Sequence, residues 1–498
     1  MIDLARYEAL TPAPRAIFER LPERKTRVRF MVPKGADYEA VTWQRYATEI
    51  QRAAMFLQST GFERGARAAI FGNNSVSWMV AAMAIQGSGG VLVPIDPAST
   101  AEQAAYVLSH GDVGALFVES ALLGKALGAL VGNAGVRKIV VLGEFDLAAL
   151  VKDLKQKGRP APSLAERDGR VFSYEECLAR GSDAPEGSPG AFEARLAQVT
   201  LEDRALMLYT SGTTGNPKGV PLTYRNTGQN GFDWLKCFAP LLAEGYVDIL
   251  WLPMSHIFGL GEAMIGDSPR WIPYLESPAR VITRLPGVRP RVFLSFTASW
   301  EKIAGQVAQE PEADRQRQEL ARLTGGRLRF CLSGGAGLKR EVKELFYRHG
   351  LLILEGYGLS ECSPTLTLNR PGEFRFDSVG KPLPSVEIKL AEDGEILARG
   401  PNVFSGYHKD EEATRGCFTE DGWFMTGDVG RFTDGFGNKL TVAAVANPVR
   451  SGRRPEALHD RVPGYGLIHL DPRTRTITFE AWKRSAEPGE PADTGCYV

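Results

Sequence analysis

Hydrophobic residues change their spacing several times along the first 150 residues of the chain. From Thr42 they recur every three or four positions, which predicts a helix that Thr42 caps and that stops at Gly61. A further helix is predicted over residues 76–86, and another starts at Thr100, where Thr100 and Gln103 form a capping box. Strands that alternate with helices and are apolar throughout indicate a parallel sheet covered on both faces. The short apolar runs that predict these strands are residues 68–71, 91–94, 115–118 and 138–142.

After about residue 146 the chain becomes polar, which predicts a surface connection with one short helix after Ser173. The apolar run Ala205–Tyr209 then predicts a buried strand, and parallel sheets bind ligands at the carboxyl ends of their strands. The loop that follows, Thr210–Lys218, is crowded with hydroxyl groups, glycines and one lysine. Glycines let backbone N–H groups turn towards one point, so this loop is suited to cradle a polyanion. Its spacing differs from the P-loop of NTPases, because Lys218 follows a proline and precedes a glycine. The alternative for a generic loop of this composition is a hydrophilic hairpin turn.

Bulk composition narrows the class of protein. With 498 residues the chain is too long for one compact core, so two or more domains are expected. Its 59 Lys and Arg residues balance 59 Asp and Glu residues, which gives no electrostatic reason to expect nucleic acid or an acidic membrane as partner. The six cysteines include no Cys-x-x-Cys pair, which argues against a disulfide framework or a zinc site. No apolar run has the length of a membrane span, so a soluble cytoplasmic protein is expected.

Later segments place small, aromatic or acidic residues directly after predicted strands. Residues 249–259 predict a strand that runs into a turn containing His256, although a lone histidine is more often a packed side chain than a catalyst. Residues 328–338 predict a strand that ends in a turn of small residues, against which a flat ring could lie. Such turns with two glycines are common. Residues 354–362 would by themselves predict a glycine turn with a solvated glutamate. Residues 421–430 would predict a turn formed by Asp428.

The chain resembles the adenylate-forming enzymes. The resemblance is carried, in order along the chain, by the loop at residues 209–220 and by residues 249–259, 328–338, 354–362, 394–407 and 421–430. This superfamily contains acyl-CoA synthetases, fatty acyl-AMP ligases and luciferases. The resemblance spans roughly residues 42–436 and is most similar to long-chain fatty acyl-CoA synthetases. It implies an α/β fold in which residues 1–436 form a large adenylate-forming domain, with helix-covered parallel sheets and a smaller β subdomain. It also implies ATP-dependent activation of a fatty acid through an acyl-adenylate, followed in relatives by transfer to CoA.

The resemblance also assigns roles to single residues. Tyr357 would stack on adenine, and Asp428 would accept hydrogen bonds from both ribose hydroxyls. Glu361, with Thr214, would hold Mg²⁺, which prefers one or two carboxylates together with phosphate oxygens and water. An attacking carboxylate needs no general base, so the catalytic site has to position the reactants and neutralise charge. The residues with the catalytic role are Lys218, Thr214, Ser360 beside the α-phosphate, and Glu361. The implied nucleotide-binding residues are Thr210, Ser211, Gly212, Thr213, Thr214, Gly215, Lys218, Gly334, Gly335, Ala336, Glu355, Gly356, Tyr357, Gly358, Ser360 and Asp428.

An acyl pocket is implied at Trp234, His256, Phe258 and Gly259, and for any one of these residues plain core packing is the alternative. Two segments depart from the family's pattern. In residues 264–271 a Pro-Arg pair replaces an apolar strand and is poorly suited to the centre of a sheet, and residues 294–302 lack the usual Pro-Arg before the aromatic residue. The expected partners are a fatty acid, ATP and CoA, and not nucleic acid. Peripheral contact with a membrane through the lipid substrate and the oligomeric state are left open.

The resemblance stops after Phe436. The family continues there into a hinge and a mobile C-terminal domain, whereas residues 437–498 predict a short atypical segment with a β-hairpin. The strands of this hairpin are predicted at residues 467–470 and 476–482. The last lysine, Lys483, lacks the Gly-Lys context of the lysine that reaches the α-phosphate in relatives. Two alternatives are therefore an ATP- and acyl-binding protein with impaired turnover, and a fatty acyl-AMP ligase that stops at the adenylate.

Overall fold

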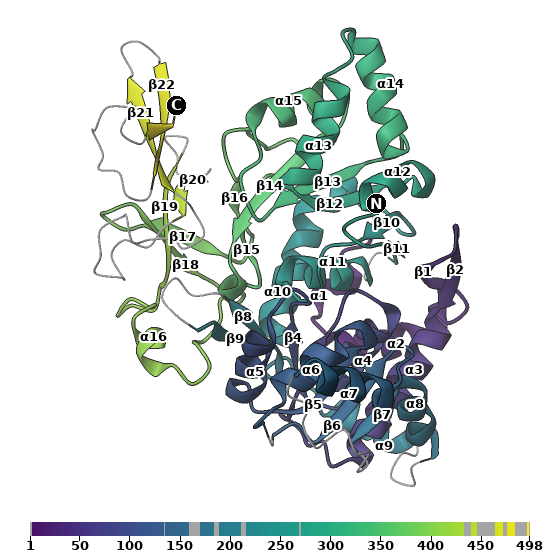
Figure 1. The fold of residues 1–498 in the computed structure, drawn as a ribbon. Helices are drawn as coiled ribbons and strands as arrows, with labels where there is room; N and C mark the ends of the chain where they lie inside the picture. The colour runs from purple at the N-terminus through teal and green to yellow at the C-terminus, as the bar shows by residue number, and fades with distance from the viewer. Residues whose placement is uncertain are drawn as a thin grey trace.

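A computed structural model describes residues 2–133, 135–158, 170–183, 189–210, 216–267 and 270–432, with four later strands at residues 440–445, 464–471, 476–483 and 496–497. The chain forms one large sheet from its N-terminal half, a second large sheet from its middle together with residues 28–42, and small sheets towards its C-terminus (Figure 1). The predicted α/β class, with a smaller β part, is confirmed.

The first large sheet has seven strands in the order β7-β6-β5-β3-β4-β8-β9. Its neighbours pair in parallel, except that β8 and β9 are antiparallel. This arrangement confirms the parallel sheet that the alternation of helices and strands predicts. The strands are β3 (Arg67–Phe71), β4 (Val91–Ile95), β5 (Val113–Glu119), β6 (Lys138–Leu142), β7 (Val171–Ser173), β8 (Arg204–Thr210) and β9 (Lys218–Thr223).

Four of the helices around this sheet begin where the sequence predicts, at residues 43, 76, 101 and 174. The segment after residue 146, predicted to be a surface connection with a short helix, also contains two further helices and the edge strand β7. The Thr42 side chain caps its helix by accepting a hydrogen bond from the backbone N–H of Arg45, and Thr100 and Gln103 form the predicted capping box. One helix is buried at every position from Trp78 to Gly87, as its uninterrupted apolar sequence requires. The elements are α3 (Trp43–Ser59), α4 (Val76–Gly87), α5 (Ala101–His110), the 3₁₀ helix η1 (Ser120–Leu122), α6 (Leu123–Ala129), α7 (Leu147–Gln156), α8 (Tyr174–Asp183) and α9 (Pro189–Ala197).

The second large sheet has nine strands in the order β16-β15-β14-β13-β12-β10-β11-β1-β2. Its central strands are parallel, and the pairs at its two edges are antiparallel. The strands are β1 (Val28–Lys34), β2 (Asp37–Thr42), β10 (Val247–Leu250), β11 (Ile272–Leu275), β12 (Val292–Phe296), β13 (Phe330–Gly334), β14 (Ile353–Gly358), β15 (Thr365–Leu368) and β16 (Lys381–Pro382). The helices are α1 (Ala5–Glu8), α2 (Ala13–Arg24), α10 (Tyr224–Phe238), η4 (Ala239–Leu241), α11 (Ile257–Asp267), α12 (Val281–Val288), α13 (Thr297–Val307), α14 (Ala313–Thr324), α15 (Arg340–Arg348) and η5 (Ser360–Cys362).

The segment whose Pro-Arg pair conflicts with a central strand avoids that conflict by turning first. Helix α11 continues to Asp267, and β11 begins only at Ile272, between β10 and β1. Arg270 lies between them in the left-handed region with φ 56°, which is a turn conformation. The central position of the strand is therefore kept, while the unusual residues precede it.

Two small antiparallel sheets complete the described part of the chain. The first contains β17 (Glu387–Leu390), β18 (Glu395–Arg399), β19 (Phe424–Phe432) and β20 (Leu440–Val445), with α16 (Glu411–Arg415) between β18 and β19. The second contains β21 (Gly464–Asp471), β22 (Thr476–Lys483) and β23 (Cys496–Tyr497), and the pairing of β21 with β22 confirms the predicted hairpin. Strand β20 pairs with β19 across the domain boundary expected after residue 436, so that boundary stays a prediction.

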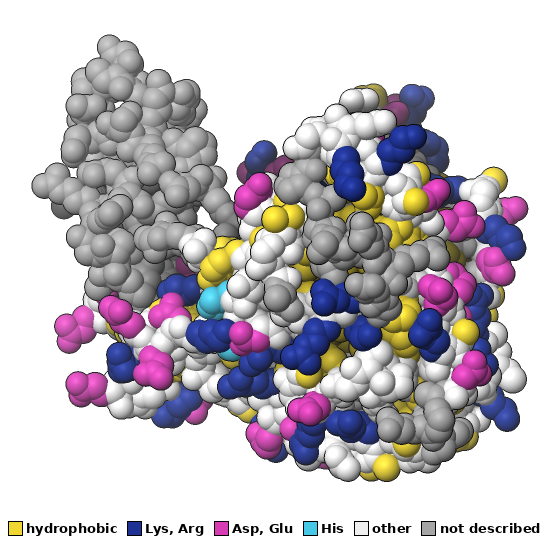
Figure 2. Space-filling model, turned by 60° about the horizontal axis from the view of Figure 1, so that its bottom comes forward, with side chains coloured by type: hydrophobic (Ala, Val, Ile, Leu, Met, Phe, Trp, Pro, Cys, Tyr) yellow, Lys and Arg dark blue, Asp and Glu magenta, His cyan; other side chains and the backbone are white. Residues whose placement is uncertain are grey.

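One continuous hydrophobic core joins the two large sheets and the helices between them. The five cysteines whose side chains the structure describes are buried free thiols. Within the described residues, no helix combines the length and the apolar character needed to cross a membrane. On the face shown in Figure 2, basic and acidic side chains are interspersed, as the balanced charge of the sequence leads one to expect.

Candidate active site

The two ends of the candidate phosphate loop are held by a pair of strands. Residues 205–208 of β8 are buried, which fixes this strand in the sheet, and its last residue, Thr210, is the cross-strand partner of Lys218 at the start of β9. The antiparallel pairing therefore holds Thr210 and Lys218 opposite each other. Ser211, Gly212, Thr213, Thr214 and Gly215 lie outside the described residues, so their phosphate and metal contacts stay predictions.

Lys218 and Glu361 meet at one tyrosine ring. The Nζ atom of Lys218 lies over the ring of Tyr407, 4.7 Å from its centroid, and the Tyr407 hydroxyl donates a hydrogen bond of 3.0 Å to Oε1 of Glu361. Tyr407 is held in turn by its backbone N–H, which donates to Oγ1 of Thr414. The fold thus brings together a lysine from β9 and a carboxylate from η5, although 143 positions separate them in the sequence.

Tyr357 and Asp428, predicted to contact adenine and ribose, are bonded to each other. The Tyr357 hydroxyl donates to Oδ2 of Asp428 at 2.6 Å, which joins the end of β14 to β19. Asp428 is only 5% exposed, and its backbone N–H donates to Oγ1 of Thr426. Burial and the neighbouring Asp428 carboxylate raise the pKa of Tyr357 well above its usual value, so the hydroxyl keeps its proton.

Ser360 and Glu361 form the short helix η5 directly after β14. The approach to this helix is tight, because a Cβ atom added at Gly358 would lie 1.8 Å from the carbonyl oxygen of Pro364. Glu361 is buried, and its backbone carbonyl accepts a hydrogen bond from the N–H of Phe404. Among the described residues no group of three or more His, Cys, Asp or Glu could hold a metal ion. A single carboxylate beside phosphate oxygens suits Mg²⁺, which keeps most of its ligands as water and phosphate.

Gly334 is the last residue of β13, Gly335 and Ala336 follow it in the predicted turn, and Glu355 lies behind this turn. The buried Glu355 carboxylate accepts hydrogen bonds from the backbone N–H of Leu338, at 2.6 Å, and from Nζ of Lys343. In this structure Glu355 therefore holds the turn in place from its buried side. Gly356 belongs to β14, which pairs with β15 next to the same turn.

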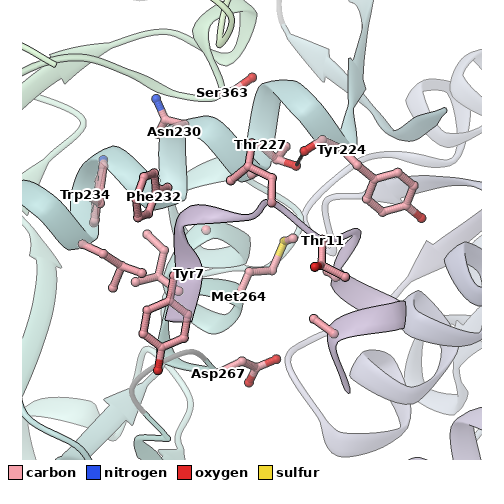
Figure 3. Close-up of a pocket in the computed structure, with 18 of the residues that line it drawn as sticks. Tyr7, Thr11, Tyr224, Thr227, Asn230, Phe232, Trp234, Met264, Asp267 and Ser363 are labelled. Atoms are coloured by element: carbon pink, nitrogen blue, oxygen red, sulfur yellow. Dashed lines mark hydrogen bonds between the residues drawn. The ribbon is translucent and has the colours of Figure 1, made fainter. Parts of the chain in front are cut away.

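The ring that lies against Gly334 belongs to Phe258. A Cβ atom added at Gly334 would lie 3.1 Å from the Phe258 ring, and the same ring packs edge-on against Phe296, with 6.0 Å between centroids. Phe258 also lines a cavity of about 130 Å³ between α10, α11 and the N-terminal helices (Figure 3). The Phe258 ring thus separates this cavity from the turn predicted to bind nucleotide.

Of the four residues predicted to form the acyl pocket, Trp234 and Phe258 line the cavity. Trp234 is buried, and its indole Nε1 donates to Oγ1 of Thr365 at 2.9 Å, which orients the ring. Gly259 is instead a point of close backbone packing, because an added Cβ atom would lie 2.5 Å from the carbonyl oxygens of Leu252 and Pro253.

His256 lies outside this cavity and pairs with the first large sheet. Its Nε2 atom is 2.7 Å from Oδ2 of Asp96, the residue that follows β4, and this contact lowers the pKa of Asp96. The other carboxylate oxygen of Asp96 accepts the backbone N–H of Ala98 at 2.8 Å. His256 is therefore part of a link between the two sheets, beside the segment that carries Phe258.

Two further histidines lie beside the end of β8. Nδ1 of His110 is 2.9 Å from the Tyr209 hydroxyl, and the rings of His110 and His408 are 5.3 Å apart. The backbone N–H of His408 donates to the carbonyl oxygen of Gly219 in β9. Burial lowers the pKa of both histidines, so at neutral pH they add no positive charge near Lys218.

Five residues that contribute to the site or to the cavity wall are not among the site residues named from the sequence. Tyr407 ends the matched segment 394–407, so its place in the chain could have suggested it. Asp96 follows a predicted strand at the carboxyl edge of the sheet, where ligands bind. No local signal marks Tyr7, Arg20 and Arg24, which come to the cavity wall from α1 and α2, far in the sequence from the lining residues of α10 and α11.

Comparison with known proteins identifies the family. The sequence profile of the AMP-binding enzymes matches residues 17–408. The chain is 30% identical over 507 aligned residues to the long-chain-fatty-acid--CoA ligase FadD15 of Mycobacterium bovis, covering 89% of this chain and 79% of that protein. It is 28% identical to the peroxisomal long chain acyl-CoA synthetase 6 of Arabidopsis thaliana, covering 82% of this chain and 62% of that protein.

Solved structures show the same fold. The anthranilate CoA ligase AuaEII in complex with anthranoyl-AMP superposes with a TM-score of 0.72 at 19% identity, over 98% of this chain and 90% of that one. Apo MatB from Rhodopseudomonas palustris superposes with a TM-score of 0.67 at 22% identity, over 88% of this chain and 79% of that one. With a family profile that matches most of its length and relatives near 30% identity, this chain belongs to the AMP-binding enzymes, and its curated relatives are acyl-CoA ligases.

Proposed function

We propose that this protein activates a fatty acid with ATP through an acyl-adenylate and then transfers the acyl group to CoA. The observation that carries the proposal is the convergence of Lys218 and Glu361 on Tyr407, because it unites a cation and a carboxylate from two segments predicted to bind nucleotide. The names of the relatives, which are long-chain fatty acid–CoA ligases, support the choice of acid.

In the first half-reaction a carboxylate oxygen of the acid forms a bond to the α-phosphorus of ATP. The bond from that phosphorus to the oxygen bridging to the β-phosphate breaks, and pyrophosphate leaves. No proton has to be removed from the attacking carboxylate, so the site needs charge neutralisation and alignment more than a base. In the second half-reaction the CoA sulfur attacks the acyl carbon, AMP leaves, and the thiol proton passes to solvent.

The residues divide this work among them. Lys218 would neutralise charge on the phosphates, and Ser360 would donate to the α-phosphate. Glu361 would hold Mg²⁺, which when bound screens the phosphate charge. Asp428 would exchange its hydrogen bond from the Tyr357 hydroxyl for hydrogen bonds from the ribose hydroxyls, and the Tyr357 ring would stack on adenine. The 2.6 Å hydrogen bond between the two residues supports this assignment, because it places them side by side.

The cavity lined by Trp234 and Phe258 would take the acyl chain. Its volume of about 130 Å³ is below the range of roughly 300–1,000 Å³ for ligand pockets. Acids of medium chain length would fit first, and longer chains would require the cavity to widen. Because burial of a methylene group contributes about 0.8 kcal/mol, affinity should rise with chain length until the cavity is full.

The test is acid-dependent exchange of labelled pyrophosphate into ATP, measured over saturated acids from acetate upward, with CoA thioester formation measured in parallel. Lys218→Met and Glu361→Gln should each lower exchange by roughly 10²- to 10³-fold. Lys389→Met is the matched control, because Lys389 is a half-buried lysine of β17 that pairs with Asp421 and lies outside the candidate site. Exchange without thioester would indicate a fatty acyl-AMP ligase, whereas ATP binding without exchange for any acid would refute the enzyme function.

A further inference from the structure

The cavity between α10, α11 and the N-terminal helices has two chemically different ends. One end contains Ser363 and Asn230. Ser363 directly follows the helix η5 that carries Glu361, and the Asn230 side chain donates a hydrogen bond to the backbone carbonyl of Cys362 in the same helix. On the opposite side of the view in Figure 3 lie Tyr7 and Asp267, and Arg24 lines the same end. An acid that presents its reacting carboxylate near η5 therefore extends its chain towards a polar, charged wall.

The charges at this far end do not balance. Arg20 and Arg24 line the cavity, and neither has a carboxylate within ion-pair distance in the part of the chain that the structure describes. Asp267 is the single acidic residue in the cavity wall, and its carboxylate is already ion-paired with the buried Arg29. Within the cavity wall, Arg20 and Arg24 therefore carry positive charge that Asp267, already paired with Arg29, does not neutralise.

Of the two arginines that line the cavity, Arg24 is the more confined, with 3% of its surface exposed. Two of its nitrogens donate to backbone carbonyls, those of Asp267 at 3.1 Å and Ala16 at 3.4 Å, and its face lies 3.7 Å from the ring centroid of Trp43. Its Nε has no hydrogen-bond acceptor among the described residues. Burial lowers the pKa of Arg24 to about 10, which leaves it charged at neutral pH. A buried cation without a carboxylate partner is costly, and an anion delivered by a ligand would offset that cost.

We propose that this cavity selects acids that carry a second anionic group at the far end of the chain, that is, α,ω-dicarboxylic acids of medium length. The reacting carboxylate lies at the Ser363 end, and the distal carboxylate pairs with Arg24 and Arg20. This inference rests on the proposed function, because it specifies the acid that the same site activates. The volume of about 130 Å³ favours a chain of medium length over a long one.

The experiment compares octanoate with octanedioate, which have equal chain length and differ at the distal end. Both are assayed by pyrophosphate exchange and by the shift in melting temperature that each acid causes in the presence of ATP. The wild-type protein should prefer octanedioate by roughly tenfold or more, as expected for a charge-assisted pair. Arg24→Met should abolish this preference, and Arg24→Lys, which keeps the charge, should retain part of it.

Two further variants keep the test decisive if Arg24 proves necessary for folding. Arg20→Met changes a half-buried residue at the same wall and should also reduce the preference. Arg15→Met removes an arginine of the same helix that pairs with Glu19 and is absent from the cavity wall, so it should leave the preference unchanged. Exchange with octanoate but not with octanedioate would overturn this inference and leave the proposed function standing. The absence of exchange with either acid, or with any other acid tested, would overturn the proposed function itself.

Discussion

Replacing Tyr407 by phenylalanine would remove a single hydroxyl from the centre of the candidate site and keep the aromatic ring. That hydroxyl donates to Oε1 of Glu361 at 3.0 Å, and the ring supports Nζ of Lys218 at 4.7 Å from its centroid. Tyr407→Phe therefore deletes the hydrogen bond alone, whereas Tyr407→Leu deletes the hydrogen bond and the cation–π contact. The two variants separate the orientation of the predicted metal ligand from the placement of the lysine.

The expected size of each effect follows from the kind of contact. A hydrogen bond to a charged group contributes about 1.5–3 kcal/mol, and loss of a residue that orients a metal ligand typically costs about 10- to 100-fold in metal affinity or activity. We therefore expect Tyr407→Phe to raise the Mg²⁺ concentration for half-maximal exchange roughly tenfold. A cation–π contact contributes about 0.5–2 kcal/mol, so Tyr407→Leu should lower the exchange rate by a further factor of roughly 2 to 30.

The assay is pyrophosphate exchange over a Mg²⁺ titration, together with the melting shift that ATP produces with and without Mg²⁺. For Tyr407→Phe the shift without Mg²⁺ should equal that of the wild type, because only the metal-dependent part changes. Tyr246→Phe is the matched control, since the Tyr246 ring lies beneath Arg291 and takes no part in the site. A Mg²⁺ dependence of Tyr407→Phe identical to that of the wild type would show that the hydroxyl does not orient Glu361 for the metal.

Three other substitutions test how burial and close packing affect stability. Glu262 is 1% exposed, and neither of its carboxylate oxygens has a hydrogen-bond partner among the described residues. Burial raises the pKa of Glu262 well above its usual value. The folded state keeps the Glu262 proton at pH values where the unfolded state has lost it, so the protein loses stability as the pH rises. Glu262→Gln removes this loss and should raise the melting temperature more at pH 8 than at pH 5. Equal gains at both pH values would contradict this reasoning. Burial lowers the pKa of His408 below its usual 6.5, so the unfolded protein takes up a proton at this residue more readily, and the folded state loses stability as the pH falls through 6.5. His408→Gln should therefore reduce the loss of melting temperature between pH 7.5 and 5.5. An unchanged slope would show that His408 does not cause this loss. Gly358→Ala should destabilise the protein by roughly 3 kcal/mol in urea unfolding, since the new Cβ would overlap the carbonyl oxygen of Pro364; a loss below roughly 0.5 kcal/mol would show that this turn relaxes.

The parts of the fold that were predictable depend on neighbours in the sequence. The capping box of Thr100 and Gln103 joins residues three positions apart, and the buried strand before the phosphate loop is visible as a run of apolar residues. The C-terminal hairpin was likewise predictable, because alternation and a turn segment lie within twenty residues of each other. In each case the physical cause acts over a few positions of the chain.

The rest of the site depends on contacts between distant segments. Asp96 and His256 meet although 160 positions separate them, and Tyr407 reaches Glu361 across 46 positions. No periodicity encodes such pairs, since each joins two segments that come together only when the chain folds. Asp96 follows β4 and His256 precedes α11, and Tyr407 lies outside helices and strands, whereas Glu361 belongs to η5. The same holds for the cavity: Trp234 and Phe258 could be named from a family pattern, whereas Arg24 comes to the cavity wall from a helix more than two hundred positions away.

The wall that α1 and α2 give to the cavity is built from a part of the chain that supplies none of the residues proposed to bind ATP. Substitutions in these two helices can therefore change which acid fits while the phosphate loop, Glu361 and Asp428 stay as they are. If the cavity binds the acid as proposed, the choice of acid can evolve without changes to the residues proposed to activate it. For protein engineers, exchanging roughly the first two dozen residues between relatives offers a compact library in which acid selectivity varies and the adenylating machinery remains constant.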